Sequence, residues 1–288
     1  MRSVILHIEG GIGKNILATG LLNPIHRKYP EHKIIIVTAH KDVWRNNTQV
    51  YKVYGFDNTE NLYTDHINQD TIMMLHDPYR AHDYIHGNKH LLEVWCDLYG
   101  LDFSITEPKM KFTKLETDLV EMMVRTDPRP IAIIQAFGGA EQQNHKYSWM
   151  RDIPPGIAQE IVNRLSETHR VIQVRRPDQI ELQSAESLSL GIRELAIALR
   201  FADKRILIDS FLQHAAYAQR LKSNVLWIGN DPKVLGYQFH NNIISNPIQM
   251  GDIYQSMYHK YDILGNPIQL DQDPNQLFDI DQLMKSLI

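Results

Sequence analysis

Residues 7–20, HIEGGIGKNILATG, contain a glycine-rich turn between an apolar stretch and a helical pattern. The stretch at 4–8 is apolar on both faces, which is typical of a strand in a parallel sheet. The residues from 15 to 29 predict a helix. A glycine turn of this kind allows a ligand to approach the strand end and the helix N-terminus. We therefore expect the first βα unit of an α/β sheet here, with either a ligand site or a plain tight turn.

The same turn resembles the phosphate loop of ATPases without matching it. A Walker loop, G-x-x-x-x-G-K-[ST], that ends at Gly13 and Lys14 needs its first glycine at Ile8. The residue after the lysine should be Ser or Thr, to hold magnesium, and it is Asn15. A variant loop would need a lysine at Glu9. These mismatches disfavour a triphosphate site. An ATPase is therefore the weakest of the functional hypotheses considered for this chain.

Strand and helix patterns alternate along the chain, which predicts βαβ units and a doubly wound α/β architecture. The expected strands are 4–8, 34–37, 72–75, 131–136, 171–174, 206–208 and 225–228. The expected helices are 15–29, 91–99, 157–168, 193–201 and 213–221.

A charged segment with two prolines, residues 125–130, is a plausible linker. We expect two Rossmann-like domains that face a cleft, at about 1–126 and 127–265. The tail, residues 266–288, contains an amphipathic pattern. It should dock on the body of the protein, with a return to the first domain as one option.

Composition narrows the class of protein. The chain has 288 residues, of which 43% are hydrophobic and 22% charged, as in a soluble globular protein. The formal net charge of −4 disfavours a nucleic-acid partner. The single cysteine, Cys96, forms no internal disulfide or thiolate zinc site, which fits a reducing cytoplasm. No apolar run is long enough to span a membrane, and the start is too short for a secretory signal.

A family resemblance becomes specific when the motifs are taken in order. Residues 13–22, GKNILATGLL, lead to the pair Tyr29-Pro30 and a second strand. This arrangement resembles the opening of the heptosyltransferase-like enzymes, glycosyltransferase family 9. In the second half, 207–216, LIDSFLQHAA, resembles the family signature D-[ST]-G-x-x-H-x-A, with Phe211 in place of its glycine. Residues 146–149, KYSW, resemble its K-x-W segment, one residue longer.

The resemblance implies a GT-B fold, in which two Rossmann-like domains hold a nucleotide sugar in the cleft between them. The donor would lie mostly against the C-terminal domain and the acceptor against the N-terminal domain. Such a fold normally needs no metal and no other cofactor. The chain is thus expected to be a metal-independent, inverting glycosyltransferase that transfers a hexosyl or heptosyl group. The acceptor would be a glycan, a lipopolysaccharide-type molecule or a small molecule, and it could bring the enzyme into peripheral contact with membrane lipids.

The leaving nucleoside diphosphate needs cations and N–H donors. By resemblance, Asp209, Ser210 and His214 form the diphosphate site at a strand end and helix start. A structural cap of the helix is the alternative function of Asp209 or Ser210. Lys146 is the expected phosphate-facing cation. Arg175 follows a strand at the cleft edge and is a second candidate, although a surface arginine is as plausible.

The general base is the least certain assignment. The resemblance implies an aspartate just after Gly13, where this chain has Lys14. A lysine acts as a base only if its pKa is lowered, so Lys14 more simply binds a phosphate or an acidic acceptor. Asp77 and His76 follow the strand at 72–75 and are the candidates for the base. The acceptor-side loops are expected to include Gly11, Gly13, Lys14 and His82.

Three histidines, His82, His86 and His90, are spaced as on one helix face and could bind a metal there. Gly87 and Asn88 weaken that helix, so a polar loop that contacts acceptor or water is favoured over a metal site. The remaining alternative for the whole chain is a non-catalytic or repurposed GT-B protein that binds a nucleotide sugar or glycan. Lys14 and Phe211 both favour that alternative over a standard enzyme.

Overall fold

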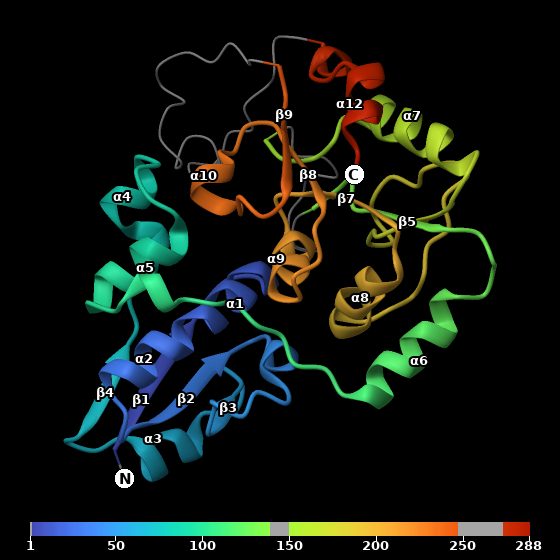
Figure 1. Ribbon diagram of the computed structural model, residues 1–288. Helices are drawn as coiled ribbons and strands as arrows, with labels where there is room; N and C mark the ends of the chain where they lie inside the picture. The colour runs from blue at the N-terminus through green and yellow to red at the C-terminus, as the bar shows by residue number, and fades with distance from the viewer. Residues whose placement is uncertain (1, 139–149, 247–272) are drawn as a thin grey trace.

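The computed structural model describes residues 2–138, 150–246 and 273–288. They form a mixed α/β structure with two parallel sheets (Figure 1). The first sheet has the order β3-β2-β1-β4 and the second β6-β5-β7-β8-β9. The first consists of β1 (Ser3–Ile8), β2 (Lys33–Thr38), β3 (Lys52–Tyr54) and β4 (Thr71–Met74). The second consists of β5 (Ile131–Ile134), β6 (Arg170–Gln173), β7 (Lys204–Ile208), β8 (Asn224–Trp227) and β9 (Asn241–Ile244).

Helices lie between the strands, because parallel neighbours need a crossover connection. The helices of the first half are α1 (Ile12–Ala18), α2 (Leu22–Lys28), α3 (Glu60–His66), α4 (His82–Ile85), α5 (Leu91–Tyr99) and α6 (Lys114–Val124). Those of the second half are α7 (Pro155–Ser166), α8 (Ile192–Ala198), α9 (Phe211–Ala218), α10 (Pro232–Leu235) and α12 (Ile280–Ser286). The single helix expected at 15–29 is divided by a 3₁₀ turn, η1 (Thr19–Leu21). Pro24 has no N–H to donate to the preceding turn, which explains the division.

The sheet orders create a crevice in each half. β1 lies between β2 and β4, and β5 lies between β6 and β7. At such a point the connections leave a strand pair in opposite directions, and the carboxyl ends of the strands are open to a ligand. The segments that follow β1, β4, β5 and β7 are therefore the ones placed to form a site.

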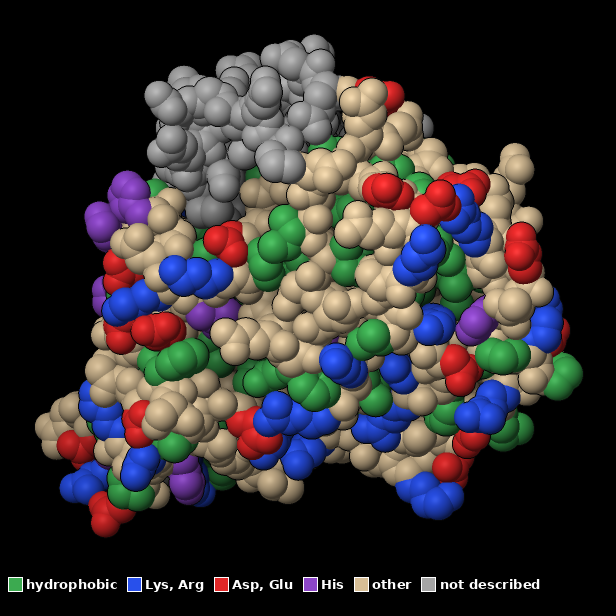
Figure 2. Space-filling model, turned by 45° about the horizontal axis from the view of Figure 1, so that its top comes forward, with side chains coloured by type: hydrophobic (Ala, Val, Ile, Leu, Met, Phe, Trp, Pro, Cys, Tyr) green, Lys and Arg blue, Asp and Glu red, His purple; other side chains and the backbone are tan. Residues whose placement is uncertain are grey.

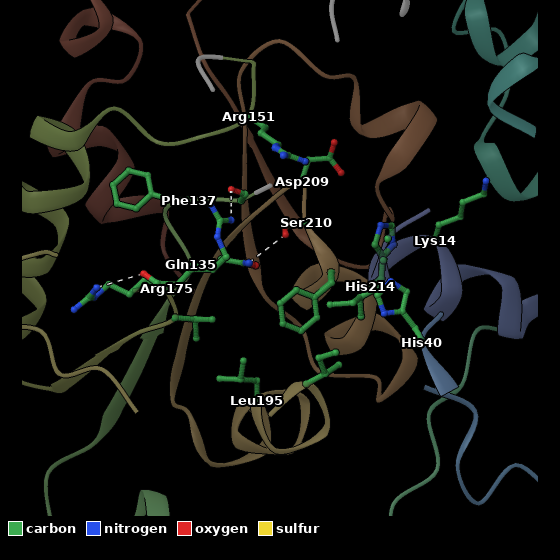
Figure 3. A pocket seen from close by; sticks show the side chains of 18 of the residues that line it. Lys14, His40, Gln135, Phe137, Arg151, Arg175, Leu195, Asp209, Ser210 and His214 are labelled. Atoms are coloured by element: carbon green, nitrogen blue, oxygen red, sulfur yellow. Dashed lines mark hydrogen bonds between the residues drawn. The ribbon is translucent and has the colours of Figure 1, made fainter. Parts of the chain in front are cut away.

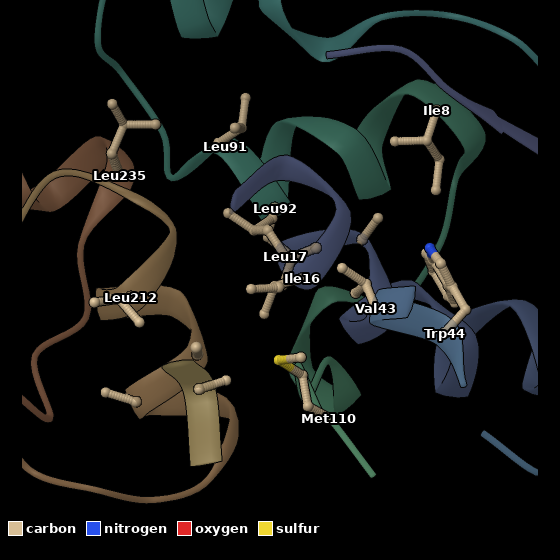
Figure 4. Close-up of a cluster of buried hydrophobic side chains, with 14 of the residues drawn as sticks. Ile8, Ile16, Leu17, Val43, Trp44, Leu91, Leu92, Met110, Leu212 and Leu235 are labelled. Atoms are coloured by element: carbon tan, nitrogen blue, oxygen red, sulfur yellow. The ribbon is translucent and has the colours of Figure 1, made fainter. Parts of the chain in front are cut away.

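The two halves are joined by an apolar core. One cluster of buried side chains includes Ile16 and Leu17 of α1 together with Leu212 and Ala215 of α9, all fully buried (Figure 4). Helices α1 and α9 pack directly against each other. Apolar burial of this kind is the main source of stabilisation between packed elements.

A buried arginine adds a polar link between the halves. Arg193 of α8 is 3% exposed. Its guanidinium donates to both carboxylate oxygens of Glu116 on α6, at 2.7 and 3.0 Å, and to the carbonyls of Asp42 and Lys111. Each of its three guanidinium nitrogens thus donates to at least one acceptor, which is what a buried arginine requires.

The C-terminal tail packs on the second half. Leu277 and Leu283 belong to the apolar cluster between the second sheet and α7. Asp281 of α12 accepts a hydrogen bond from Arg164 of α7 at 2.6 Å. The chain end also bonds Asn224 in β8. The amphipathic pattern is thus satisfied within the second half, and the described contacts of the tail do not include a return to the first half.

The surface is mixed in character. On the face that Figure 2 shows, Lys and Arg side chains are interspersed with Asp and Glu. In the part of the chain that the structure describes, none of the helices combines the length and the apolar character needed to cross a membrane.

Candidate functional site

A cavity of about 1380 Å³ lies at the carboxyl ends of both sheets (Figure 3). It is lined by residues that directly follow β1, β4, β5 and β7, the strands on either side of the two crevices. Of the lining residues that Figure 3 labels, Lys14 and His40 come from the first half, and Gln135, Phe137 and Arg175 come from the second. A ligand in this cavity would contact both halves.

Lys14 and Asp77 form an ion pair at the cavity wall. The Lys14 Nζ lies 2.7 Å from Asp77 Oδ1, and the two side chains are 3% and 21% exposed. The same Oδ1 accepts from the backbone N–H of Tyr79 at 3.0 Å. The ammonium also lies over the rings of Tyr79 and Trp95, 4.7 and 5.6 Å from their centroids. Burial lowers the pKa of Lys14, and the hydrogen bond and charge of Asp77 oppose this.

The glycine turn serves the packing of α1. Gly10 has φ +93°, a conformation that glycine adopts without strain, and Gly11 precedes the helix. At Gly13 an added Cβ would lie 2.9 Å from the His214 ring and 3.4 Å from the Phe211 Cα. Gly13 therefore permits the close approach of α1 to α9. Because Lys14 of this turn is bound to Asp77, the turn does not present a phosphate-loop lysine.

The tip of β7 forms the opposite wall. Asp209 is buried and its Oδ2 accepts a hydrogen bond from Asn230. Ser210 precedes α9 in extended conformation, and its Oγ accepts from Gln135 Nε2 at 3.1 Å. Its side chain makes no capping hydrogen bond to α9. The alternative of a structural cap is thus absent at Ser210, whose hydroxyl lines the cavity.

Phe211 takes the position of the signature glycine without strain. It is the first residue of α9, and the described non-glycine residues with positive φ are Asn46, Ser184 and Arg220. Its side chain lines the cavity. Phe211 therefore adds a side chain to the cavity wall at this position without a strained backbone.

His214 is buried and neutral. Its Nδ1 lies 2.8 Å from the Tyr237 hydroxyl. Burial, followed by the neighbouring His90 and His240, lowers the pKa of His214 to about 3. His214 lines the cavity from α9, but it carries no charge at neutral pH with which to bind a phosphate.

Three arginines of the second half line the cavity. Arg175 pairs with Glu181 at 3.0 Å and donates to Ser187, and Arg176 pairs with Asp178 at 3.0 Å. Arg151 has Asp152 as its nearest carboxylate, at 3.9 Å. The sequence singled out Arg175 but missed Arg151 and Gln135. Gln135 directly follows β5, and Arg151 lies close to Gly138, which also follows β5. A polar residue directly after a buried strand is the signal that could have indicated Gln135.

Some expected residues lie elsewhere. His76 is exposed and does not line the cavity, and its backbone N–H donates to the Tyr99 hydroxyl. His82 is also exposed and outside the lining. Lys146 lies outside the described residues.

The helix expected to align three histidines ends early. α4 stops at Ile85, Gly87 has φ +66°, and His90 instead caps α5 through its Nδ1. Within residues 2–138, 150–246 and 273–288, no cluster of three His, Cys, Asp or Glu side chains is arranged to hold a metal ion.

Comparisons with known proteins identify the fold. No family model matches the sequence, and no curated protein matches it significantly. Solved structures do match over nearly the whole chain. The chain has the fold of glycosyltransferases. The ADP-heptose lipopolysaccharide heptosyltransferase II of E. coli has a TM-score of 0.64 at 11% identity, covering 99% of this chain and 98% of that one.

Two further matches agree. A family 9 glycosyltransferase of Veillonella parvula has a TM-score of 0.65 at 11% identity, covering 99% of this chain and 95% of its own. The iron-containing dodecameric glycosyltransferase TibC of enterotoxigenic E. coli has a TM-score of 0.67 at 14% identity, covering 99% of this chain and 74% of its own. The resemblance to heptosyltransferases and family 9 enzymes inferred from the sequence motifs is confirmed at the level of structure.

Proposed function

We propose that the chain is a metal-independent, inverting glycosyltransferase of GT-B type. It would transfer a sugar from a nucleotide-sugar donor to a glycan, a lipopolysaccharide-type molecule or a small-molecule acceptor, in the cytoplasm. Residues 1–126 would form the acceptor domain and 127–265 the donor domain, with the cavity as the cleft between them. The fold supports this proposal, as do the ligands of two similar proteins, heptosyltransferase WaaC with ADP and TibC with ADP-D-β-D-heptose.

One observation carries the proposal. The carboxylate of Asp77, after β4, and the hydroxyl of Ser210, after β7, line the same cavity from different sheets. A transfer reaction needs a base beside the acceptor and donors beside the leaving diphosphate. This cavity has a candidate for each on opposite walls.

We assign the base to Asp77 rather than His76, since only Asp77 lines the cavity. Oδ1 is held by Lys14 and the Tyr79 N–H. Oδ2 has no hydrogen-bond partner among the described residues, so it is the oxygen that would accept the acceptor proton. The two donors on Oδ1 fix the direction of the carboxylate.

In the proposed reaction the acceptor hydroxyl gives its proton to Asp77 Oδ2 as its oxygen attacks the anomeric carbon. The bond from that carbon to the diphosphate oxygen breaks, and the nucleoside diphosphate leaves with the electron pair. The Ser210 hydroxyl and the N-terminal N–H groups of α9 would stabilise the charge that grows on the leaving group. Attack opposite the leaving group inverts the anomeric centre.

A second candidate is a GT-B protein that binds a nucleotide sugar or glycan without catalysis. Lys14 favours it, because it stands where the resemblance implies an aspartate. An ATPase is weaker still, since Lys14 is bound to Asp77.

The decisive experiment measures binding of ADP, UDP and GDP by calorimetry. Release of the diphosphate from the matching nucleotide sugars is then followed with a panel of acceptors, in the presence of EDTA. The enzyme hypothesis predicts binding and acceptor-dependent release. Binding without release would favour the non-catalytic alternative, and magnesium-dependent ATP binding alone would favour an ATPase.

A further inference from the structure

The charges that line the cavity favour an anionic ligand. Five lining residues are cationic and two are anionic. The cations are Lys14, Arg80, Arg151, Arg175 and Arg176, and the anions are Asp77 and Asp209. Because this cavity is partly enclosed, an excess of cations raises the local concentration of anions and strengthens their binding.

Most of these cations are already matched. Lys14 pairs with Asp77 at 2.7 Å, Arg175 with Glu181 at 3.0 Å and Arg176 with Asp178 at 3.0 Å. Arg80 is exposed, so water solvates its charge. A cation in a strong ion pair, or one fully solvated, gains less from an added anion than a desolvated cation does.

Arg151 differs from the other four. Its side chain is only 21% exposed, and its contact with Asp152 at 3.9 Å is too long for a hydrogen bond. Its Nε is buried and has no hydrogen-bond partner among the described residues. A buried N–H without an acceptor costs free energy, which an incoming oxygen anion would recover.

The backbone leaves a place for this guanidinium. An added Cβ at Gly138, which follows β5, would lie 3.2 Å from Arg151 Nε and 3.4 Å from Cζ. Gly138 donates its N–H at 2.9 Å to Asp152 Oδ1, the carboxylate oxygen that lies 3.9 Å from Arg151 Nε. The guanidinium is thus held against the cavity wall beside the end of β5.

Arg151 also faces the first half of the molecule. Burial raises the pKa of Tyr79, and among the charges that act on this hydroxyl are Asp209, Asp77 and, in the opposite direction, Arg151. Tyr79 lies directly beneath the Lys14 ammonium. Arg151, Asp77 and Asp209 thus all act on the same hydroxyl, and all three residues line the cavity.

We infer that Arg151 binds the diphosphate of the donor and makes the cavity selective for a nucleoside diphosphate over the nucleoside. The inference rests on the proposed function and takes its evidence from the unmatched guanidinium. Two N–H groups of its planar fork would donate to phosphate oxygens, a geometry that lysine does not provide. Arg175, the candidate from the sequence, would then serve as a structural arginine bound to Glu181 and Ser187.

The test compares two ligands on one protein. Calorimetry first identifies which of ADP, UDP and GDP binds the wild type most tightly, and then measures that diphosphate and its nucleoside on each variant. Arg151→Ala should lose about tenfold to hundredfold in affinity for the diphosphate, with the nucleoside affinity unchanged. Arg151→Lys should lie between it and the wild type. Arg45→Ala, at an exposed arginine outside the cavity lining, is the matched control.

The outcomes separate the two proposals. If the wild type binds none of the three diphosphates, the proposed function fails and this inference fails with it. If the wild type binds a diphosphate and Arg151→Ala or Arg151→Lys retains the full preference over the nucleoside, only the role of Arg151 is overturned. Arg151→Lys keeps the test open should the alanine variant not fold, and thermal unfolding of each variant establishes that it is folded.

Discussion

Gly13 of α1 lies against His214 of α9, so that a Cβ atom at residue 13 would lie 2.9 Å from His214 Cδ2. This is closer than real Cβ atoms approach their neighbours, and the Phe211 Cα lies just beyond, at 3.4 Å. The glycine that first resembled part of a phosphate loop thus fixes the distance between a helix of the first half and one of the second. Lys14, the next residue, pairs with Asp77, and Ser210 directly precedes α9, so this contact lies beside both walls of the cavity.

Gly13→Ala should therefore destabilise the protein. The added methyl must displace either the His214 ring or the α9 backbone, and overpacking of this kind costs about 1–3 kcal/mol. Urea unfolding measures the change. Gly11→Ala is the control, because an added Cβ there meets nothing within 4 Å. Equal stability of the two variants would show that α1 and α9 do not pack as described.

Arg193→Met should also destabilise the protein, by about 3–5 kcal/mol, because it leaves the Glu116 carboxylate without its buried partner. The double variant Arg193→Met with Glu116→Gln should recover part of this loss, since the unpaired charge is then removed. Both are compared by urea unfolding at pH 7. A loss below about 0.5 kcal/mol for the single variant would mean that this ion pair does not link the halves.

Stability should fall as the solution is acidified below pH 6.5. Burial lowers the pKa of His240 to about 4, and that of His214 to about 3. Between these pKa values and about pH 6.5, the unfolded chain binds protons that the folded chain does not. The free energy of unfolding therefore rises with pH across this window and falls as the solution is acidified through it. Each such histidine contributes a slope of about 1.4 kcal/mol per pH unit.

Urea unfolding at pH 7.0, 6.0 and 5.0 tests this prediction. His240→Gln, which can still donate to the Gln213 carbonyl, should reduce the slope of the unfolding free energy against pH by the contribution of about one proton. His82→Gln, at an exposed histidine, is the matched control and should keep the wild-type slope. An unchanged slope in His240→Gln would contradict the burial of a neutral His240.

Asp77→Asn should lower turnover by about 10²–10⁴-fold and leave donor affinity nearly unchanged, because the amide cannot accept the acceptor proton. Steady-state kinetics with saturating donor gives kcat, and calorimetry gives the affinity. His76→Gln, next to Asp77 but outside the cavity lining, is the control. Intact turnover in Asp77→Asn would exclude this carboxylate as the base.

Most of the fold could be predicted from local pattern. The strands from β1 to β8 other than β3 each contain an apolar run, which is buried in all of them except β4. Their order along the chain indicates a parallel α/β structure. β3, Lys52–Tyr54, and β9, Asn241–Ile244, were missed because they are short and carry polar residues at the sheet edge. Helix α5, Leu91–Tyr99, was predicted at its observed bounds because Gly100 ends it in the left-handed conformation.

The site was less predictable, because its side chains meet only in three dimensions. Asp77, Ser210 and Arg175, which each follow a strand, line one cavity. Position after a strand could not reveal that Lys14 would turn to Asp77, because that partner is 63 residues away in the sequence. It also could not reveal that Glu181 would pair with Arg175, because that contact depends on the path of the loop that joins the two residues. Arg151 gave no local signal at all, because its distinction is the lack of a close acceptor.

The most direct test of the central claim is a crystal structure of the protein soaked with the nucleoside diphosphate that binds it most tightly in solution. The proposed function predicts density in the cavity between the two sheets. Phosphate oxygens should lie within hydrogen-bond distance of Ser210, and the terminal phosphate should face Asp77. The proposed function would be contradicted by a nucleotide that binds outside this cavity. It would also be contradicted by a nucleotide whose phosphates lie away from the tip of β7.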